Sequence, residues 1–125
     1  MLLLVCSFSG LVFSQEQPIR VSLEDILRAP DKYNGKLIET RGFLLQEFEN
    51  NALYANVKWQ YAKGVWITSA TDLHISRDEV NRRYVIVTGL FDANDRGHLG
   101  SFRGTLKVQK LLIEDTKQKD SSQKP

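Results

Sequence analysis

The stretch YVIVTGLFDA, residues 84–93, decides the fold, because it places a glycine in the middle of a run of strand-forming residues. Valine, isoleucine and aromatic residues favour β-strands. Gly89 interrupts this run, and a glycine inside a strand permits the bulge or sharp bend that a barrel corner requires. A second stretch, KLIETRGFLLQEF at residues 36–48, repeats the pattern at Gly42. We therefore expect two long strands that bend around a small barrel.

Three shorter segments between and after these two stretches also favour strands. They are rich in β-branched or aromatic residues, or alternate apolar and polar side chains, with turn-forming residues beside them. In the last of them, Leu106 and Val108 alternate with Thr105, Lys107 and Gln109. The three segments are LYANVKWQYA (residues 53–62), GVWITS (64–69) and GTLKVQKLLIED (104–115).

Two helices are expected from their capping residues. Ser22 is a good N-cap for a helix with acidic residues in its first turn, and Pro30 ends that helix. Ser76 and Glu79 have the spacing of a capping box for a short second helix. The predicted order is helix, three strands, short helix, two strands, which favours a mainly β, five-stranded barrel. An open five-stranded sheet of another topology is the alternative.

This order resembles the OB-fold, and more closely the small secreted bacterial OB-fold proteins of unassigned function. The resemblance lies in YNGKLIETRGFL, ALYANV, GVWI and YVIVTGLFDANDRGHLGSFRGTL, and it extends from about Val21 to Asp115. It implies an OB-fold-like barrel with an N-terminal helix and a short helix between strands three and four. It also implies a binding or structural module, because the family provides no catalytic residue.

The first fourteen residues, MLLLVCSFSGLVFS, carry no charge, and Val12 and Ser14 stand where a signal peptidase accepts small residues. They are shorter than the roughly 18–20 apolar residues that cross a bilayer. We therefore predict a signal peptide at residues 1–14, cleavage before Gln15, and a secreted or periplasmic protein. Lipidation at Cys6 is the alternative. Residues 15–115 are the predicted domain, and the polar residues 116–125 are a predicted disordered tail.

Charge and cysteine content exclude several classes of function. The chain has 17 basic and 15 acidic residues, all after residue 14, so the mature net charge is +2. This balance lacks the strongly basic character that is usual in nucleic-acid-binding domains. Cys6 is the one cysteine, and it lies in the predicted signal peptide. The mature chain would therefore have no disulfide, no cysteine nucleophile and no cysteine-bound zinc.

The polar stretch DANDRGHLGSFRG, residues 92–104, matches no catalytic or metal-binding motif. A calcium loop would need oxygen ligands where Arg96 and Arg103 stand. A zinc site usually needs three protein ligands, and the chain has only His74 and His98 as histidines. GSFRG has its serine one position too early for a nucleophile elbow. We therefore predict no catalytic residue, no metal and no cofactor, and interpret this stretch as a turn that doubles as a ligand-contacting loop.

The resemblance to the OB-fold implies where a ligand would bind. In that fold the ligand face lies over strands two and three, between the loop joining strands one and two and the loop joining strands four and five. Trp59 and Tyr61, which have polar neighbours, are the predicted exposed aromatic platform. The remaining predicted contacts come from the two loops: Asn50 and Asn51 in EFENNA (residues 47–52), and Arg96, His98 and Arg103.

We therefore predict a secreted or periplasmic, non-enzymatic binding or interaction module, whose ligand is a protein, a peptide or an envelope glycan. The alternative is a protein that binds single-stranded nucleic acid, as many OB-folds do. Its basic candidates are Lys58, Lys63, Arg82, Arg83, Lys107 and Lys110. The sequence leaves the oligomeric state and the identity of the ligand open.

Overall fold

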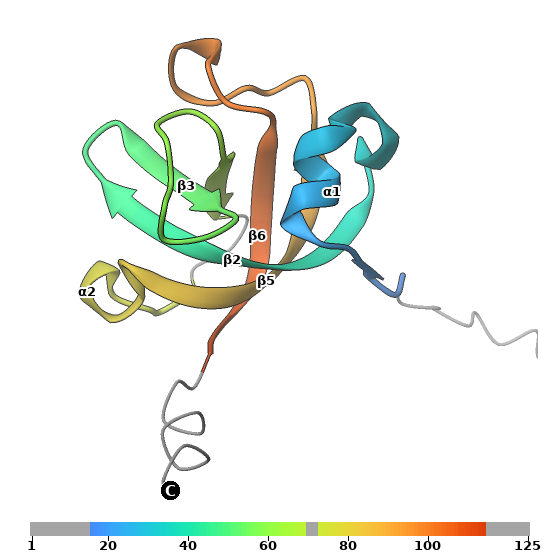
Figure 1. Ribbon diagram of the computed structural model, residues 1–125. Coiled ribbons are helices and arrows are strands. Elements are labelled where there is room, and N and C mark those ends of the chain that lie inside the picture. The colour runs from blue at the N-terminus through green and yellow to red at the C-terminus, as the bar shows by residue number, and fades with distance from the viewer. Residues whose placement is uncertain (1–15, 70–72, 115–125) are drawn as a thin grey trace, which may run out of the picture.

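The structure, a computed structural model, describes residues 16–69 and 73–114, and its five long strands close into a barrel (Figure 1). The barrel order is β2-β3-β4-β6-β5, and pairing of β2 with β5 closes it. β4 and β6 are parallel, and the other barrel pairs are antiparallel. The strands are β2 (Leu37–Glu47), β3 (Asn50–Tyr54), β4 (Val65–Ser69), β5 (Arg83–Asp92) and β6 (Thr105–Ile113). The predicted mainly β, OB-fold-like barrel is confirmed.

Both predicted helices are present. α1 (Leu23–Arg28) begins after Ser22, whose Oγ accepts a hydrogen bond from the backbone N–H of Asp25 at 3.1 Å. α2 (Arg77–Val80) lies between β4 and β5. The predicted capping box is replaced by a bond between the two side chains: the Ser76 hydroxyl donates to the Glu79 carboxylate at 3.0 Å, and Ser76 does not cap a backbone N–H.

Short elements flank these helices and strands. β1 (Ile19–Arg20), which the sequence did not predict, adds to β2 in parallel. The 3-10 turn η1 (Pro30–Tyr33) follows α1, since Pro30 ends the helix as predicted. A second 3-10 turn, η2 (His98–Gly100), lies in the loop between β5 and β6.

The predicted bulge occurs at Gly89. The register of β5 against β6 shifts between Thr88 and Gly89, and a Cβ on Gly89 would lie 2.3 Å from the carbonyl oxygen of Lys107. Only glycine lets the two backbones approach this closely. At Gly42, by contrast, the pairing of β2 with β5 has no shift, and the side chain of Leu23 from α1 packs close to the glycine.

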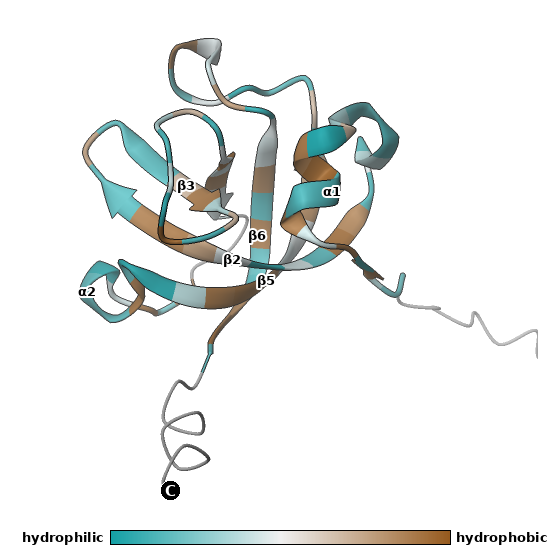
Figure 2. Cartoon of the chain, viewed as in Figure 1, coloured by the Kyte–Doolittle hydropathy of each residue, from teal (hydrophilic) through white to brown (hydrophobic). Residues whose placement is uncertain are grey.

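Two hydrophobic cores lie on opposite sides of the sheet. The first fills the barrel and receives Leu23 and Ile26 from α1. The second lies on the outer side of β2 and β3 and consists of Phe43, Leu45, Ala52, Tyr54 and Phe102. Apolar segments of the strands appear brown in Figure 2. Because the second core covers the outer face, β2 has buried residues on both faces from Gly42 to Leu45.

The prediction of the second strand was wrong in its bounds. β3 ends at Tyr54, and residues 55–64 form a loop, so Trp59 and Tyr61 do not lie on a strand. The Asn56 side chain accepts a hydrogen bond from the backbone N–H of Lys58 at 2.8 Å, which turns the chain away from the sheet. The aromatic residues of this segment had favoured a strand, but they serve as loop residues that pack on the outer core.

The predicted loop between strands one and two, residues 47–52, was also wrong. Glu47 pairs with Asn50 in the ladder, so the connection is only the turn Phe48–Glu49. Thr105, which alternates with the apolar Leu106 in the sequence, is nevertheless fully buried and donates from its Oγ1 to the Asp95 carbonyl at 2.8 Å. The loop between β5 and β6 covers it.

Some predictions concern residues outside the described part of the chain. The signal peptide at 1–14, its cleavage before Gln15, Cys6 and the tail at 116–125 all lie there. Within residues 16–69 and 73–114, no helix has the length and apolar character needed to cross a bilayer.

Candidate binding face at the loop tips

Three segments meet on the outer side of β3 and β4: the Phe48–Glu49 turn, the loop 55–64 and the loop 93–104. Nε2 of His98 lies 3.8 Å from Oε1 of Glu49, and the Tyr61 hydroxyl donates to the Glu49 carbonyl at 3.2 Å. The turn between β2 and β3 therefore contacts both loops. We call the surface they form the tip face and define it by Phe48, Glu49, Tyr61, Trp66, His98 and Leu99.

Phe102 anchors the tip face from below. Its side chain is fully buried, with ring centroids 5.6 Å from Tyr61 and 5.0 Å from Trp66. Nε of Arg96 donates to the Phe102 carbonyl at 2.9 Å, and the Phe102 N–H donates to the Arg96 carbonyl at 2.9 Å. Because ring packing and a paired hydrogen bond fix the same residue, the loop 93–104 is held against the barrel.

The backbone of this loop also rests on Trp66. Gly97 has φ 67°, and a Cβ there would lie 2.5 Å from Cγ of Trp66. The imidazole of His98 stacks on the indole, with centroids 6.2 Å apart and planes at 23°. Trp66 is thus the half-buried floor of the tip face.

The aspartates at the start of the loop stabilise its backbone. Oδ1 of Asp92 accepts from the N–H groups of Asn94 at 2.9 Å and Asp95 at 3.3 Å. Oδ1 of Asp95 accepts from the N–H of Gly97 at 3.1 Å. These are the turn-forming bonds that Asp favours. Among the residues that the structure describes, no three His, Cys, Asp or Glu side chains gather as a metal site would require.

Two large apolar side chains project from the tip face into solvent. Phe48 is 88% exposed and Leu99 is 83% exposed. Leu99 itself has a left-handed backbone, with φ 54°, whereas at the hairpin the left-handed residue is Glu49, with φ 58°, and not Phe48. Side chains other than glycine, asparagine or aspartate are unfavourable in that region. The tip of the β2–β3 hairpin is brown in Figure 2, which marks its apolar character.

The predicted aromatic platform is only partly exposed. Tyr61 is 48% exposed, but Trp59 is half-buried against Tyr54, with ring centroids 5.5 Å apart. Trp59 lines a small cavity of about 140 Å³ together with Lys58 and Lys63. Of the two predicted rings, the structure brings only Tyr61 to the tip face.

Asn50 lies in β3 and has a structural contact. Its side chain is buried, and its Oδ1 accepts a hydrogen bond from the Tyr54 hydroxyl at 2.6 Å. Burial raises the pKa of Tyr54 above its ordinary value, and the bond to Asn50 opposes that rise. The amide of Asn50 is thus engaged within the protein beneath the tip face.

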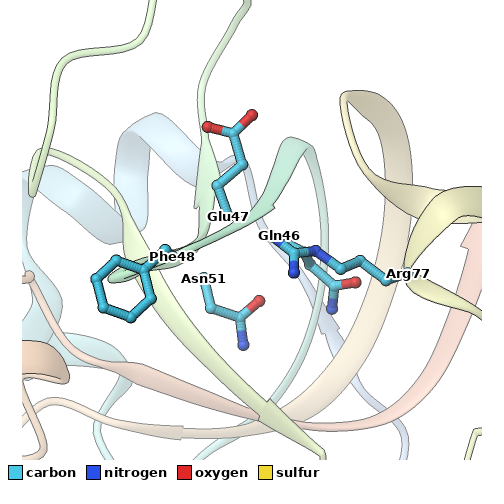
Figure 3. A pocket seen from close by; sticks show the side chains of 5 residues that line it. All are labelled: Gln46, Glu47, Phe48, Asn51 and Arg77. Atoms are coloured by element: carbon cyan, nitrogen blue, oxygen red, sulfur yellow. The ribbon is translucent and has the colours of Figure 1, made fainter.

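Asn51 lines an open cavity of about 330 Å³ beside the hairpin (Figure 3). Its Nδ2 donates to the Ile67 carbonyl at 2.9 Å, and its buried Oδ1 has no hydrogen-bond partner in the described part of the chain. Gln46, Phe48 and Arg77 also line the cavity. Figure 3 shows that Glu47 points away from Asn51, and Glu47 forms an ion pair with Arg82 at 2.7 Å.

Arg103 joins the two loops through its backbone. Its N–H donates to the Gly64 carbonyl at 3.2 Å, and its side chain is exposed. The structure thus brings Tyr61 and His98 together, places Arg96 and Arg103 at the base of their loop, and leaves Asn50 and Trp59 in the outer core. Phe48 and Leu99 were not predicted from the sequence, although a phenylalanine and a leucine at turn positions indicate exposed apolar side chains.

Comparison with known proteins supports the fold alone. No family model matches the sequence, and no curated protein matches it. Among solved structures, the chain is similar to a "putative aspartyl-tRNA synthetase" from Leishmania major Friedlin, with a TM-score of 0.50 and 11% identity. That match covers 82% of this chain, which spans only 22% of the Leishmania chain.

A second structure is a DUF3299 family protein from Pseudomonas aeruginosa PAO1, with a TM-score of 0.49 and 11% identity. The match covers 79% of this chain and 97% of the Pseudomonas chain. The similarity to the Leishmania structure supports the small β-barrel fold alone.

Proposed function

We propose that this chain is a secreted or periplasmic, non-enzymatic binding module that recognises a protein partner through the tip face. One observation carries the proposal: two large apolar side chains, Phe48 and Leu99, are almost fully exposed on adjoining turns. Secretion is supported by the uncharged, apolar residues 1–14. The OB-fold motifs quoted above support a place among the small secreted bacterial proteins of that fold.

Burial of Phe48 and Leu99 contributes little to the stability of the fold, and the backbone conformation of Leu99 lowers it. An exposed Leu or Phe gains almost nothing from burial, and a left-handed leucine is unfavourable by about 1–2 kcal/mol relative to a right-handed conformation. Turns usually carry Gly, Asn or Asp at such positions. Backbone strain combined with an exposed apolar patch is typical of surfaces that bind another molecule.

A protein partner fits this surface better than a glycan does. Sugar rings stack on flat aromatic faces that are open to solvent. Here one face of Trp66 is covered by His98, and Trp59 packs on Tyr54. What remains exposed is a phenylalanine, a leucine and the ring of Tyr61, which suit the apolar centre of a protein interface.

Photo-crosslinking in the cells that express the protein tests the proposal. p-Benzoylphenylalanine is introduced separately at Phe48, Leu99 and Leu112; the last is 51% exposed on β6 and serves as the control. We expect Phe48 and Leu99 to crosslink the same protein and Leu112 not to do so. The purified partner should then bind the parent chain and bind a Phe48→Ser, Leu99→Ser variant at least tenfold more weakly. Equal crosslinking from all three positions, or none from the two turns, would refute the proposal.

A further inference from the structure

The acidic residues of the chain are distributed unevenly. None of the 15 lies within residues 50–71 or 96–113. These two segments carry six basic residues and hence a formal charge of +6, although the whole chain carries only +2. The six are Lys58, Lys63, Arg96, Arg103, Lys107 and Lys110. The small net charge of the whole chain therefore hides two strongly basic segments.

The fold brings the two segments together beside the tip face. The hydrogen bond from the Arg103 N–H to the Gly64 carbonyl places Arg103 next to Lys63. The strands that follow these two residues, β4 and β6, pair in parallel, with Thr68 of β4 opposite Lys107 of β6. Lys63, Arg103 and Lys107 are all exposed. The basic residues thus continue from the loops onto the outer side of β4 and β6.

The charges of these residues are not neutralised within the described part of the chain. Ion pairs there involve Arg20, Arg28, Arg41, Arg82 and His98, and none of the six basic residues. Of the six side chains, that of Arg96 forms a hydrogen bond in the described part of the chain, in which its Nε donates to the Phe102 carbonyl. Lys63, Arg103 and Lys107 therefore produce a positive potential over the surface that they border, although Glu49 and Asp95 lie nearby.

We infer that the partner of the tip face is an acidic polypeptide, an inference that rests on the proposed binding function. Phe48 and Leu99 supply the apolar contacts, and Lys63, Arg103 and Lys107 supply the complementary charge. Such complementarity accelerates association and selects against basic partners. A nucleic acid would share the negative charge, but it binds aromatic platforms by stacking. In this chain the indole faces are engaged by His98 and Tyr54, which leaves only the rings of Phe48 and Tyr61 exposed, beside a leucine that offers no stacking surface.

Fluorescence anisotropy with three defined probes tests the inference. The probes are a glutamate-rich peptide with evenly spaced leucines, a lysine-rich peptide of the same length and leucine spacing, and a single-stranded oligothymidylate. The parent protein should bind the acidic peptide, and affinity should fall as salt is raised, since salt screens exposed charges. The lysine-rich peptide should bind at least tenfold more weakly.

A pair of charge-reversed variants locates the effect. The Lys63→Glu, Arg103→Glu variant should bind the acidic peptide about tenfold more weakly. The control is Lys32→Glu, Lys36→Glu, which changes the net charge equally at exposed positions outside the two acid-free segments. It should change affinity less than threefold. Circular dichroism confirms that each variant is folded.

The outcomes separate this inference from the proposed function. If Phe48→Ser, Leu99→Ser weakens binding of the cellular partner while Lys63→Glu, Arg103→Glu does not, the binding function stands and the acidic partner is refuted. Tighter binding of the oligothymidylate than of the acidic peptide would likewise overturn the inference in favour of nucleic acid. Equal losses in the two charge-reversed variants would show that only net charge matters and refute the basic surface.

Discussion

Replacing Leu99 by glycine should make the protein more stable, although it removes a large apolar side chain. Leu99 has φ 54° and ψ 19°, and it is 83% exposed. A left-handed backbone disfavours an L-residue with a side chain by about 1–2 kcal/mol. Glycine relieves this strain but increases the entropy of the unfolded chain, which destabilises by roughly 0.5–1 kcal/mol. The side chain itself buries too little surface to change this balance.

The net expectation is a gain of about 0.5–1 kcal/mol in the free energy of unfolding. For a domain of this size, about 1 kcal/mol corresponds to a rise of roughly 4–8 °C in the melting temperature. Urea denaturation followed by tryptophan fluorescence measures the gain directly, provided that the slope of the transition is unchanged.

Leu99→Ala is the matched control, because alanine removes the side chain but keeps the strain of a left-handed residue. We expect its stability to lie within about 0.5 kcal/mol of the parent, as for most exposed substitutions. A glycine variant no more stable than the alanine variant would show that the backbone at this position is not strained, which would remove the physical reason for assigning Leu99 to binding.

Three further predictions concern the outer core. Gly97→Ala should destabilise by about 3 kcal/mol in urea denaturation, because its Cβ would overlap Trp66 and φ is 67°; Gly100→Ala, with open space around its Cβ, should cost less than half as much. Phe102→Ala should lower the free energy of unfolding by about 3–5 kcal/mol, as for other fully buried phenylalanines. It should also make the 93–104 loop accessible to proteolysis. A loop that remains uncut would contradict the role of Phe102 as its anchor. Because the pKa of Tyr54 is raised in the folded state, its ionisation favours the unfolded chain, so the free energy of unfolding should hold below about pH 10 and fall as pH rises further. Thermal melts of Tyr54→Phe should show a weaker alkaline decline in melting temperature. A decline identical to that of the parent would contradict burial of the hydroxyl.

The barrel could be predicted because its strands carry local signals. Gly89 interrupts a β-branched run where the backbone of Lys107 approaches, so the bulge was visible in the sequence. Ser22 marked the start of α1 in the same way. Such signals depend on one residue and its neighbours, which is why they predict the fold well.

The outer core could not be predicted from the same patterns. Trp59 and Tyr61 have the composition of a strand, but the tertiary structure places them in a loop over the sheet. Because β2 is covered on both faces beyond Gly42, its alternation of apolar and polar residues ends there. Burial on both faces depends on a distant segment, the loop 93–104, that no local pattern identifies.

The positive charge beside the tip face was present in the sequence but was not evident from the net charge of the whole chain. A net charge of +2 argues against a charged ligand, whereas the acid-free segments 50–71 and 96–113 argue for one. Only the fold shows that these segments adjoin, through Arg103 and Gly64. Charge counted by segment therefore indicates more than the overall balance.

Mapping of backbone amide chemical shifts in the ¹⁵N-labelled protein during titration with the glutamate-rich peptide tests the central claim most directly. We predict that the shift changes concentrate at residues 48–49, 59–66 and 96–103, and that they disappear at high salt. Shifts centred instead on α1, or spread evenly over the barrel, would contradict the claim that the three loop tips form the binding face.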